Sequence, residues 1–482
     1  MRLIERLIVL SITIAAIAFL LLHSPPPIWL KVVIMATFLL IPLHAWLEGV
    51  HWQLAPAYLA SGLLLFSLAS LGASQMASTL LAVAALVLVS MSLVLSWALP
   101  MFKLPTPTGE YPIGTRTLYL TDHQREEMHA GAPPGKRQLV VQLWYPAKSS
   151  KGRRARYRQW KETKPLSSYQ AVLETHAIEN AQLPEGRFAV LVFNHAWRGF
   201  RNRTTFLAQE LASHGFVVAA VSHTYNASIV ALSDGTVARS QQFDIGFCCP
   251  TYIPLEERRA LADEELQVQV DDCSFVLDEL QRFNKTPGHP FEQHLNFDQI
   301  GTYGHSFGGA VSVELAKLDP RVKCALQLDG VFHGTAAVEG ISKPLMVIDS
   351  DVVIASPEPP ADPDPLVQAN HEWAKMSANA KMATLANLGG YRLFVDGISH
   401  ENFSDSSFMS PLRKLSHAGP MKPHRTAEIL NTCMLAFFNQ TLRNQPSRLF
   451  SEGIQPFPEA TLTIYTADAR AASISELSSK SN

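Results

Sequence analysis

Apolar residues dominate the first hundred positions of this 482-residue chain, and shorter apolar runs follow. No Asp, Glu, Lys or Arg lies between Arg6 and Lys31, or between Glu48 and Lys103. A helix that crosses a bilayer needs about 20 consecutive apolar residues. Four segments approach that length: residues 7–22, 28–46, 54–71 and 76–99. We therefore expect residues 1–103 to form a membrane region with about four transmembrane helices.

A cleaved signal peptide is the alternative interpretation of the first apolar segment. No clear small-x-small cleavage site precedes the three prolines that follow it, and three more apolar segments come after them, so we favour membrane helices. Lys and Arg concentrate on the cytoplasmic side of membrane helices. Arg2 and Arg6 precede the first segment and Lys103 and Arg116 follow the fourth, whereas only Lys31 opposes this arrangement. We expect both flanking regions, and hence the domain that follows, to lie in the cytoplasm.

From about residue 110 the pattern changes to short apolar runs separated by helical stretches, which is typical of a parallel sheet with crossover helices. The expected strands are 117–121, 139–145, 188–193, 216–222, 299–303, 324–328, 345–348 and 391–395. The expected helices are 204–213, 261–283, 309–318 and 425–443. This order predicts an α/β fold with a mostly parallel eight-stranded sheet and helices on both faces. We assign it to residues 104–446, with 447–482 as a C-terminal tail; long segments at 225–261, 352–388 and 404–422 are expected around the pocket.

A Gly-rich pentapeptide, Gly304-His305-Ser306-Phe307-Gly308, lies between one of these strands and a helix. A strand, G-x-S-x-G and a helix make the nucleophile elbow of an α/β-hydrolase. Both glycines are needed because Cβ atoms there would collide with neighbouring backbone, while a strained serine backbone exposes its Oγ. We predict that Ser306 is the nucleophile; the alternative is an ordinary serine in a Gly-rich turn.

A serine nucleophile needs a base to take its proton and an acid to orient that base. His400 is the best-placed histidine because it lies on the loop after the last expected strand. Asp329 follows the strand after the elbow, and Asp349 and Asp351 follow the next one. All three keep the chain order Ser, Asp, His, so position alone leaves the acid open. The aspartates not used would be strand-end residues that cap turns.

The tetrahedral intermediate of ester hydrolysis needs backbone N–H donors for its oxyanion. One is expected at Phe307, directly after the nucleophile. The other is expected in the loop after the 188–193 strand, which reads Asn194-His195-Ala196-Trp197-Arg198-Gly199. We interpret His195 as a buried histidine that holds this loop in shape, and Trp197 as a candidate for lining the acyl pocket.

Several further blocks occur in a characteristic order along residues 110–445. They are VQLWYP at 141–146, FNH at 193–195, LASHGFVVAAV at 211–221, SFVLD at 274–278, the elbow at 304–309, LDG at 328–330 and HENF at 400–403. In these blocks the chain resembles the type II platelet-activating factor acetylhydrolase family and its bacterial dienelactone-hydrolase-like relatives. The membrane region lies outside the resemblance.

The resemblance implies roles that position alone leaves open. It implies Asp329 as the acid, in preference to Asp349 and Asp351, and the amides of Trp197 and Phe307 as oxyanion donors. It implies a serine esterase that acts on short or oxidised sn-2 acyl chains of glycerophospholipids without a metal or cofactor. One departure is visible: the family usually has His-Gly-x-Gly where this chain has His195-Ala196-Trp197-Arg198-Gly199.

Charge and cysteine content narrow the remaining functions. A net charge of −2 gives no reason to expect nucleic acid. No CxxC or HxxxH spacing indicates a metal site, and we interpret His44 as a helix-facing or interfacial histidine. We expect an integral protein of the bacterial inner membrane whose partners are the bilayer and an ester or phospholipid substrate. A general carboxylesterase or a dienelactone or polyester hydrolase is the alternative, and a catalytically degenerate membrane scaffold is the alternative outside enzymes.

Overall fold

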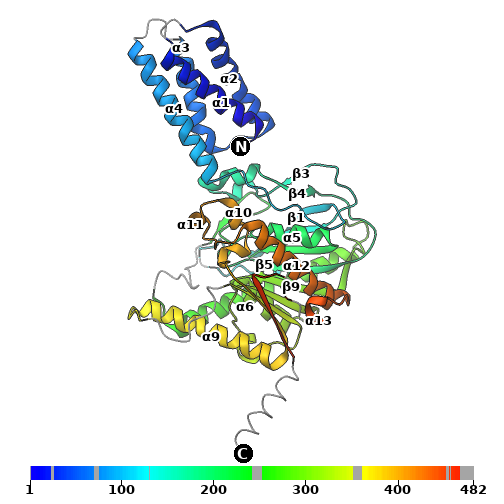
Figure 1. Ribbon diagram of the computed structural model, residues 1–482. Helices are drawn as coiled ribbons and strands as arrows, with labels where there is room; N and C mark the ends of the chain where they lie inside the picture. The colour runs from blue at the N-terminus through cyan, green and yellow to red at the C-terminus, as the bar shows by residue number, and fades with distance from the viewer. Residues whose placement is uncertain are drawn as a thin grey trace, which may run out of the picture. The chain divides into compact units, whose positions relative to one another are not determined.

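The chain folds into two compact units (Figure 1). The computed structural model describes residues 2–22, 26–69, 75–129, 131–240, 252–350, 361–451, 455 and 457–466. The first unit comprises Met1–Lys103, Arg156–Thr175 and Phe408–Ser416. The second comprises the other described residues.

The first unit is built on four apolar helices. They are α1 (Leu3–Leu21), α2 (Ile28–Leu47), α3 (Ala55–Ala69) and α4 (Gln75–Ala98), with the 3-10 turn η1 (Trp52–Leu54) leading into α3. All four are long and apolar enough to cross a membrane, α3 when counted together with η1. Small residues are fully buried between them, including Ala16, Ala57, Ala60, Ala82 and Ala85. Small side chains let apolar helices approach closely, which is how helices associate in lipid.

Two segments from far along the sequence belong to the same unit. Trp52 Nε1 donates a hydrogen bond to the carbonyl of Leu166, 3.0 Å away, in the 3-10 helix η3 (Pro165–Val172). Ser410 Oγ donates to the carbonyl of Ala98 at 2.6 Å. The helices and these two segments therefore fold as one body.

The second unit contains a large, mostly parallel sheet. Its order is β13-β12-β11-β10-β9-β5-β6-β2-β1-β4-β3, and a separate hairpin pairs β7 with β8. The strands are β1 (Ile113–Glu126), β2 (Lys136–Pro146), β3 (Arg154–Arg156), β4 (Glu174–Glu179), β5 (Phe188–Asn194), β6 (Phe216–Ser222), β7 (Ile229–Ala231), β8 (Val237–Arg239), β9 (Leu295–His305), β10 (Val322–Leu328), β11 (Leu345–Asp349), β12 (Gly390–Val395) and β13 (Ala460–Tyr465). The six strands from β6 to β12 in this order run parallel, whereas β2 and β13 are antiparallel to their neighbours.

All eight expected strands are present, but the expected number of strands was too small, because the described sheet has eleven. The three additional strands lie at its edges. β3 and β4 are short and partly polar, so their apolar pattern is weak. β13 lies in the segment expected to be a C-terminal tail and pairs with β12 along six residues.

Helices cover both faces of this sheet. They are α5 (Thr205–Ser213), α6 (Leu255–Lys285), α7 (Phe307–Leu318), α8 (Ala336–Glu339), α9 (Pro365–Leu388), α12 (Pro423–Arg443) and α13 (Arg448–Ser451). Alternate residues of β6 point to opposite faces, as strand geometry requires. Val217 and Val221 join the core that also contains residues of α6 and α7, whereas Phe216 contacts Phe438 of α12. In Figure 1, α5 and α12 accordingly lie on the side of the sheet away from α6.

Candidate active site

Three loops meet at the carboxyl edge of the sheet. Asn194 at the end of β5 pairs with Gly304, and His305 at the end of β9 pairs with Leu328 of β10. Because these parallel strands end at the same level, the residues that follow them share one edge, where open α/β sheets carry their sites. Ser306, Asp329 and the loop after β5 are thus brought together.

Ser306 lies in a strained turn between β9 and α7. Its backbone has φ 58° and ψ −123°, outside the regions that L-residues prefer, and such residues cost about 1–3 kcal/mol. A Cβ on Gly304 would overlap the carbonyl of Gly308, and one on Gly308 would overlap the carbonyl of Asn194. The Ser306 hydroxyl makes no capping bond to α7, although the residue occupies the N-cap position. The turn therefore holds the hydroxyl away from its own helix.

Asp329 and His400 form a hydrogen-bonded pair. His400 Nδ1 lies 2.7 Å from Asp329 Oδ2, and the amide of Ser350 donates to Asp329 Oδ1 at 2.8 Å. Burial raises the pKa of the Asp329 carboxyl, but His400 and Ser350 outweigh it and hold that pKa below its usual range. Burial lowers the pKa of His400, but Asp329 outweighs it and raises that pKa above its usual range. The His400 side chain is 35% exposed, whereas that of Asp329 is fully buried, so the imidazole alone reaches the surface of the site.

The other two candidate acids are placed differently. Asp349 is buried and ion-paired with Lys381 Nζ at 2.7 Å and Arg392 Nε at 3.0 Å. Two cations therefore occupy its carboxylate oxygens. Asp351 lies outside the described residues. Of the two candidate acids that lie within the described residues, Asp329 is the one bonded to His400.

The short helix η4 (His400–Phe403) presents the histidine, and its neighbours hold it in place. Asn402 Oδ1 accepts hydrogen bonds from the amides of Ser399 and Gly419, at 3.0 and 2.6 Å. His305 Nε2 donates to the carbonyl of His400 at 3.0 Å, and the two rings lie 4.5 Å apart. Burial lowers the pKa of His305 to about 3, so it stays neutral as a donor. These contacts explain why Asn402 belongs to the H-x-N-F block.

An ion pair and a helix-capping carboxylate join the His400 loop to the segment after β5. Arg203 Nη2 lies 2.5 Å from both carboxylate oxygens of Glu401. Burial opposes ionisation of Glu401, but Arg203 outweighs it and lowers the pKa to about 2. Asp405 accepts hydrogen bonds from the first two amides of α5, those of Thr205 and Phe206. A carboxylate at a helix N-terminus satisfies free N–H groups and complements the helix dipole.

The loop after β5 is a tight turn beside the elbow. The amide of Gly199 donates to the carbonyl of Ala196 at 2.7 Å, and Arg198 between them has φ 54°. The ring of Trp197 contacts that of Phe307 edge-on, with centroids 4.8 Å apart. The two expected oxyanion donors therefore belong to adjacent residues of the site.

His195 is fully buried at the base of this loop and holds the loop in shape through two hydrogen bonds. Its Nδ1 lies 2.8 Å from the carbonyl of Ala196, and its Nε2 accepts from the amide of His223 at 3.2 Å. Burial lowers the pKa of His195 to about 3, so it is a neutral imidazole that donates at one nitrogen and accepts at the other. The structure agrees with the interpretation of His195 as a structural histidine.

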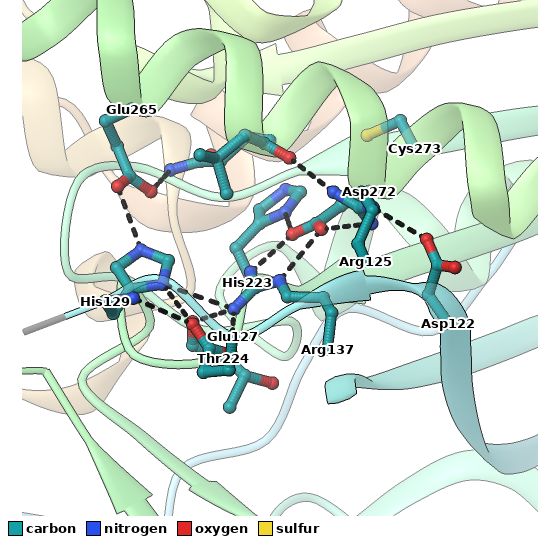
Figure 2. A network of polar contacts seen from close by, with 12 residues as sticks. Asp122, Arg125, Glu127, His129, Arg137, His223, Thr224, Glu265, Asp272 and Cys273 are labelled. Atoms are coloured by element: carbon teal, nitrogen blue, oxygen red, sulfur yellow. Dashed lines mark hydrogen bonds and ion pairs between the residues drawn. The ribbon is translucent and has the colours of Figure 1, made fainter. Parts of the chain in front are cut away.

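His223, whose amide bonds His195 of this loop, also belongs to a buried network of charged residues (Figure 2). His223 connects Asn194 Oδ1, 3.2 Å from its Nε2, to Asp272 Oδ2, 3.0 Å from its Nδ1. Arg137 binds both oxygens of Asp272, at 3.0 and 2.6 Å, and Arg125 adds a third contact at 2.8 Å. Asp272 and Arg137 are almost wholly buried, so the carboxylate compensates a guanidinium that has little access to water.

The network continues to the loop after β1. Arg137 Nη1 contacts Glu127 Oε2 at 2.7 Å. His129 then bridges two carboxylates, with Nδ1 2.7 Å from Glu127 and Nε2 3.0 Å from Glu265 of α6 (Figure 2). Burial lowers the pKa of His129, but the two carboxylates outweigh it and raise that pKa to about 9.

Sequence reasoning missed this network. One signal was available: Asp272 lies one turn before Val276 on the same face of α6, and both are buried. A carboxylate on an apolar helix face requires a buried cation. Its partner Arg137 lies 135 residues away on β2, and only the folded sheet brings the two together.

The sheet, the elbow after β9 and the Asp329–His400 pair define the class of protein, which is an α/β-hydrolase. Residues 98–447 match the family model for platelet-activating factor acetylhydrolase, isoform II. The chain belongs to that family.

Relatives of known name agree with this assignment. Platelet-activating factor acetylhydrolase of Canis lupus familiaris is 26% identical over 278 residues, covering 52% of this chain and 60% of the relative. A probable 1-alkyl-2-acetylglycerophosphocholine esterase of Arthroderma benhamiae is 24% identical over 267 residues, covering 50% and 62%. The chain thus spans about three fifths of these relatives. The structure of a ferulic acid esterase from Streptomyces cinnamoneus is 28% identical, with a TM-score of 0.58, and covers 75% of this chain and 99% of that one.

Proposed function

We propose that this protein is a membrane-anchored serine esterase in which Ser306, His400 and Asp329 form the catalytic triad. The hydrogen bond between His400 Nδ1 and the buried Asp329, beside the strained turn of Ser306, carries the proposal. A carboxylate at Nδ1 fixes the tautomer whose Nε2 is free to accept a proton. Asp349 is already held by two cations, which favours Asp329 as the acid.

The reaction follows from these roles. His400 Nε2 takes the proton of Ser306 Oγ as the oxygen attacks the ester carbonyl, and Asp329 stabilises the imidazolium that forms. The tetrahedral intermediate collapses, His400 returns the proton to the leaving alcohol, and an acyl-enzyme remains on Ser306. Water, deprotonated by His400, then attacks the acyl group and releases the carboxylic acid.

The oxyanion would be held by the amides of Phe307 and Trp197. The support is the close approach of the two loops, seen in the Trp197–Phe307 ring contact and in the overlap that a Cβ on Gly308 would make with Asn194. Ala196 replaces the family's usual glycine, and its carbonyl is tied to His195 and Gly199. We infer that these two bonds give the loop the rigidity that an oxyanion hole requires.

For the substrate we propose glycerophospholipids with short or oxidised sn-2 acyl chains. The family and the names of the mammalian and fungal relatives support this class. A general carboxylesterase is the second candidate, favoured by the ferulic acid esterase structure, which this chain matches over 99% of its length. The two candidates share the triad and differ in the acyl and alcohol groups that the loops admit.

We further propose that residues 1–103 anchor the enzyme in a bacterial inner membrane, with a catalytic domain at 104–446 and residues 447–482 as its C-terminal extension. The four apolar helices support the anchor. Arg2 before the first helix, Arg6 in its first turn and Lys103 after the fourth helix support a cytoplasmic site. Anchoring would keep the site close to lipid substrates.

The test is hydrolysis of p-nitrophenyl esters of increasing acyl length by the detergent-purified chain, beside Ser306→Ala. We expect rapid cleavage of acetyl and butyryl esters, loss of cleavage in the variant, and labelling of the wild type alone by a fluorophosphonate probe. A 2-acetyl glycerophosphocholine and a feruloyl ester, assayed next, separate the two substrate classes. Absence of both hydrolysis and labelling would refute the esterase and favour a membrane scaffold.

A further inference from the structure

A second cluster of reactive side chains lies at one end of the helical unit. Glu5 of α1, His44 of α2 and His51, just before η1, are all buried. Glu5 Oε1 lies 3.1 Å from His51 Nε2 and 3.6 Å from His44 Nε2, and the three atoms lie within 4.8 Å of one another. Two imidazole nitrogens and one carboxylate oxygen are therefore directed at a common point.

The far atom of each ligand is held by a specific partner. His51 Nδ1 lies 3.0 Å from Gln53 Oε1, and Gln53 Nε2 donates to the carbonyl of Leu99, so His51 carries its proton on Nδ1. His44 Nδ1 lies 2.8 Å from the hydroxyl of Tyr58. Such outer partners orient histidines toward bound metal ions and leave the other ring nitrogen free to coordinate.

The carboxylate of Glu5 is arranged in the same way. Its Oε2 accepts the amide of Arg2 at 2.8 Å, and its Oε1, which also accepts from Arg2 Nε, faces the two histidines. A neutral His51 then presents a lone pair at Nε2 to a carboxylate oxygen 3.1 Å away. Two acceptors at this distance repel each other unless a cation or a proton lies between them.

An independent observation points to the same place. His44 Nε2 and Glu48 Oε2 are both buried and have no hydrogen-bond partner, although they lie 3.5 Å apart. His44 is fully buried, and an unsatisfied polar atom in such a place costs about 1–3 kcal/mol. The other oxygen of Glu48, Oε1, lies 3.4 Å from the amide of Ile4, so Oε2 is the free ligand atom.

We infer that this cluster binds one divalent first-row transition-metal ion, with zinc as the best fit. The ligands would be Nε2 of His44 and His51 and an oxygen of Glu5, whose atoms already lie within 4.8 Å of one another, with Glu48 Oε2, 3.5 Å from His44 Nε2, turning in as the fourth. Zinc binds four such ligands tetrahedrally at about 2.0–2.2 Å, which places neighbouring ligand atoms about 3.3 Å apart. The Glu5–His51, Glu5–His44 and His44–Glu48 separations of 3.1, 3.6 and 3.5 Å lie close to that value.

Arg2 is the competing cation at this site. Its Nε lies 2.5 Å from Glu5 Oε1 and 3.6 Å from Glu48 Oε2, the same two oxygens that would bind the metal ion. Metal binding therefore requires the guanidinium to give up these oxygens. Four protein ligands leave no open position, so the ion would clamp α1, α2 and the start of α3 together without taking part in chemistry.

The test is the metal content of the full chain, purified in detergent with a tag that contains no histidine. We expect about one zinc per chain by mass spectrometry, loss of most of it in His51→Ala and Glu5→Gln, and full retention in His123→Ala, whose histidine is exposed on β1. Cobalt exchanged into the wild type should give the visible absorption of a tetrahedral site.

A measurement on the wild type alone covers the case in which the ligand variants fail to fold. A chelator should lower Tm by several degrees, and zinc, but not magnesium, should restore it. If the wild type carries no transition metal and neither chelator nor zinc changes Tm, the inference is overturned. A wild type without metal whose stability depends on His51 would show that a protonated histidine, paired with Glu5, occupies the site instead.

Discussion

His129 makes the stability of the buried network sensitive to pH. Its side chain is 8% exposed and lies between Glu127 and Glu265, which raise its pKa from 6.5 to about 9. In the unfolded chain the histidine returns to its ordinary pKa near 6.5. The perturbation is therefore a rise in pH from 6 to 10, applied to the wild type and to His129→Gln.

The direction and size of the contribution of His129 to the unfolding free energy follow from proton linkage. The folded state binds the proton more tightly, so the contribution is fully present below pH 6.5 and is lost as pH rises through about 9. A difference of about 2.5 pKa units, at about 1.36 kcal/mol each, corresponds to about 3 kcal/mol of unfolding free energy. That is a large part of the 5–15 kcal/mol typical of a folded protein.

The assay is urea unfolding of the detergent-purified chain, followed by tryptophan fluorescence across this pH range. Wild type should exceed His129→Gln at pH 6, and the gap should shrink by about 3 kcal/mol by pH 10. His123→Gln is the matched control, because His123 lies six residues before His129 and is exposed on β1. It should follow the wild type at every pH.

The pH dependence of the difference in unfolding free energy between wild type and His129→Gln tests whether His129 holds a proton in the folded state. If wild type and His129→Gln lose stability in parallel as pH rises, His129 does not hold a proton in the folded state and the argument is refuted. A gap that is large but independent of pH would show that the histidine contributes packing alone.

Three further predictions concern the site and its support. Asp329→Asn should lower kcat about 10⁴-fold and move the acidic limb of the kcat/KM profile to lower pH, because the carboxylate that raises the pKa of His400 is lost; an unchanged limb would argue against the pair. Gly308→Ala should abolish activity, because its Cβ would overlap the carbonyl of Asn194 at the start of the loop after β5; full activity in p-nitrophenyl butyrate assays would contradict this. Asp272→Asn should cost about 3–5 kcal/mol in urea unfolding by removing the carboxylate that the buried Arg137 binds through two nitrogens, which leaves Arg137 only the carboxylate of Glu127; Asp271→Asn, one position away and partly exposed, should cost little.

The elbow was predictable because its requirements are local. Gly304, Ser306 and Gly308 must lie within five residues, and the contacts that a Cβ would make there show why. The eight main strands were predictable for a similar reason, since each is a buried apolar run bounded by polar residues. The three outer strands were missed because β3 and β4 are short and partly polar, and β13 ends the sheet with neighbours on one side only.

The acid and the buried networks depend on geometry that the sequence does not display. Asp329, Asp349 and Asp351 all follow strands in suitable positions, and the choice among them rested on a family resemblance. The structure distinguishes Asp329 from Asp349 by what each contacts, an imidazole in one case and two cations in the other. His44, Glu48 and His51 lie within eight residues, but Glu5 comes from another helix, so the sequence alone does not show that they meet.

Two segments from far along the sequence pack with the apolar helices, so this unit is assembled from three separate parts of the chain. The chain passes between the units at residues 103, 155, 175, 407 and 416, so the helices are connected to the second unit by more than one segment of chain. Proteolysis near residue 104 would not release an intact soluble enzyme, since segments 156–175 and 408–416 would lose the helices they fold with. A truncation that removed the four helices would therefore leave both segments without the helices they pack against.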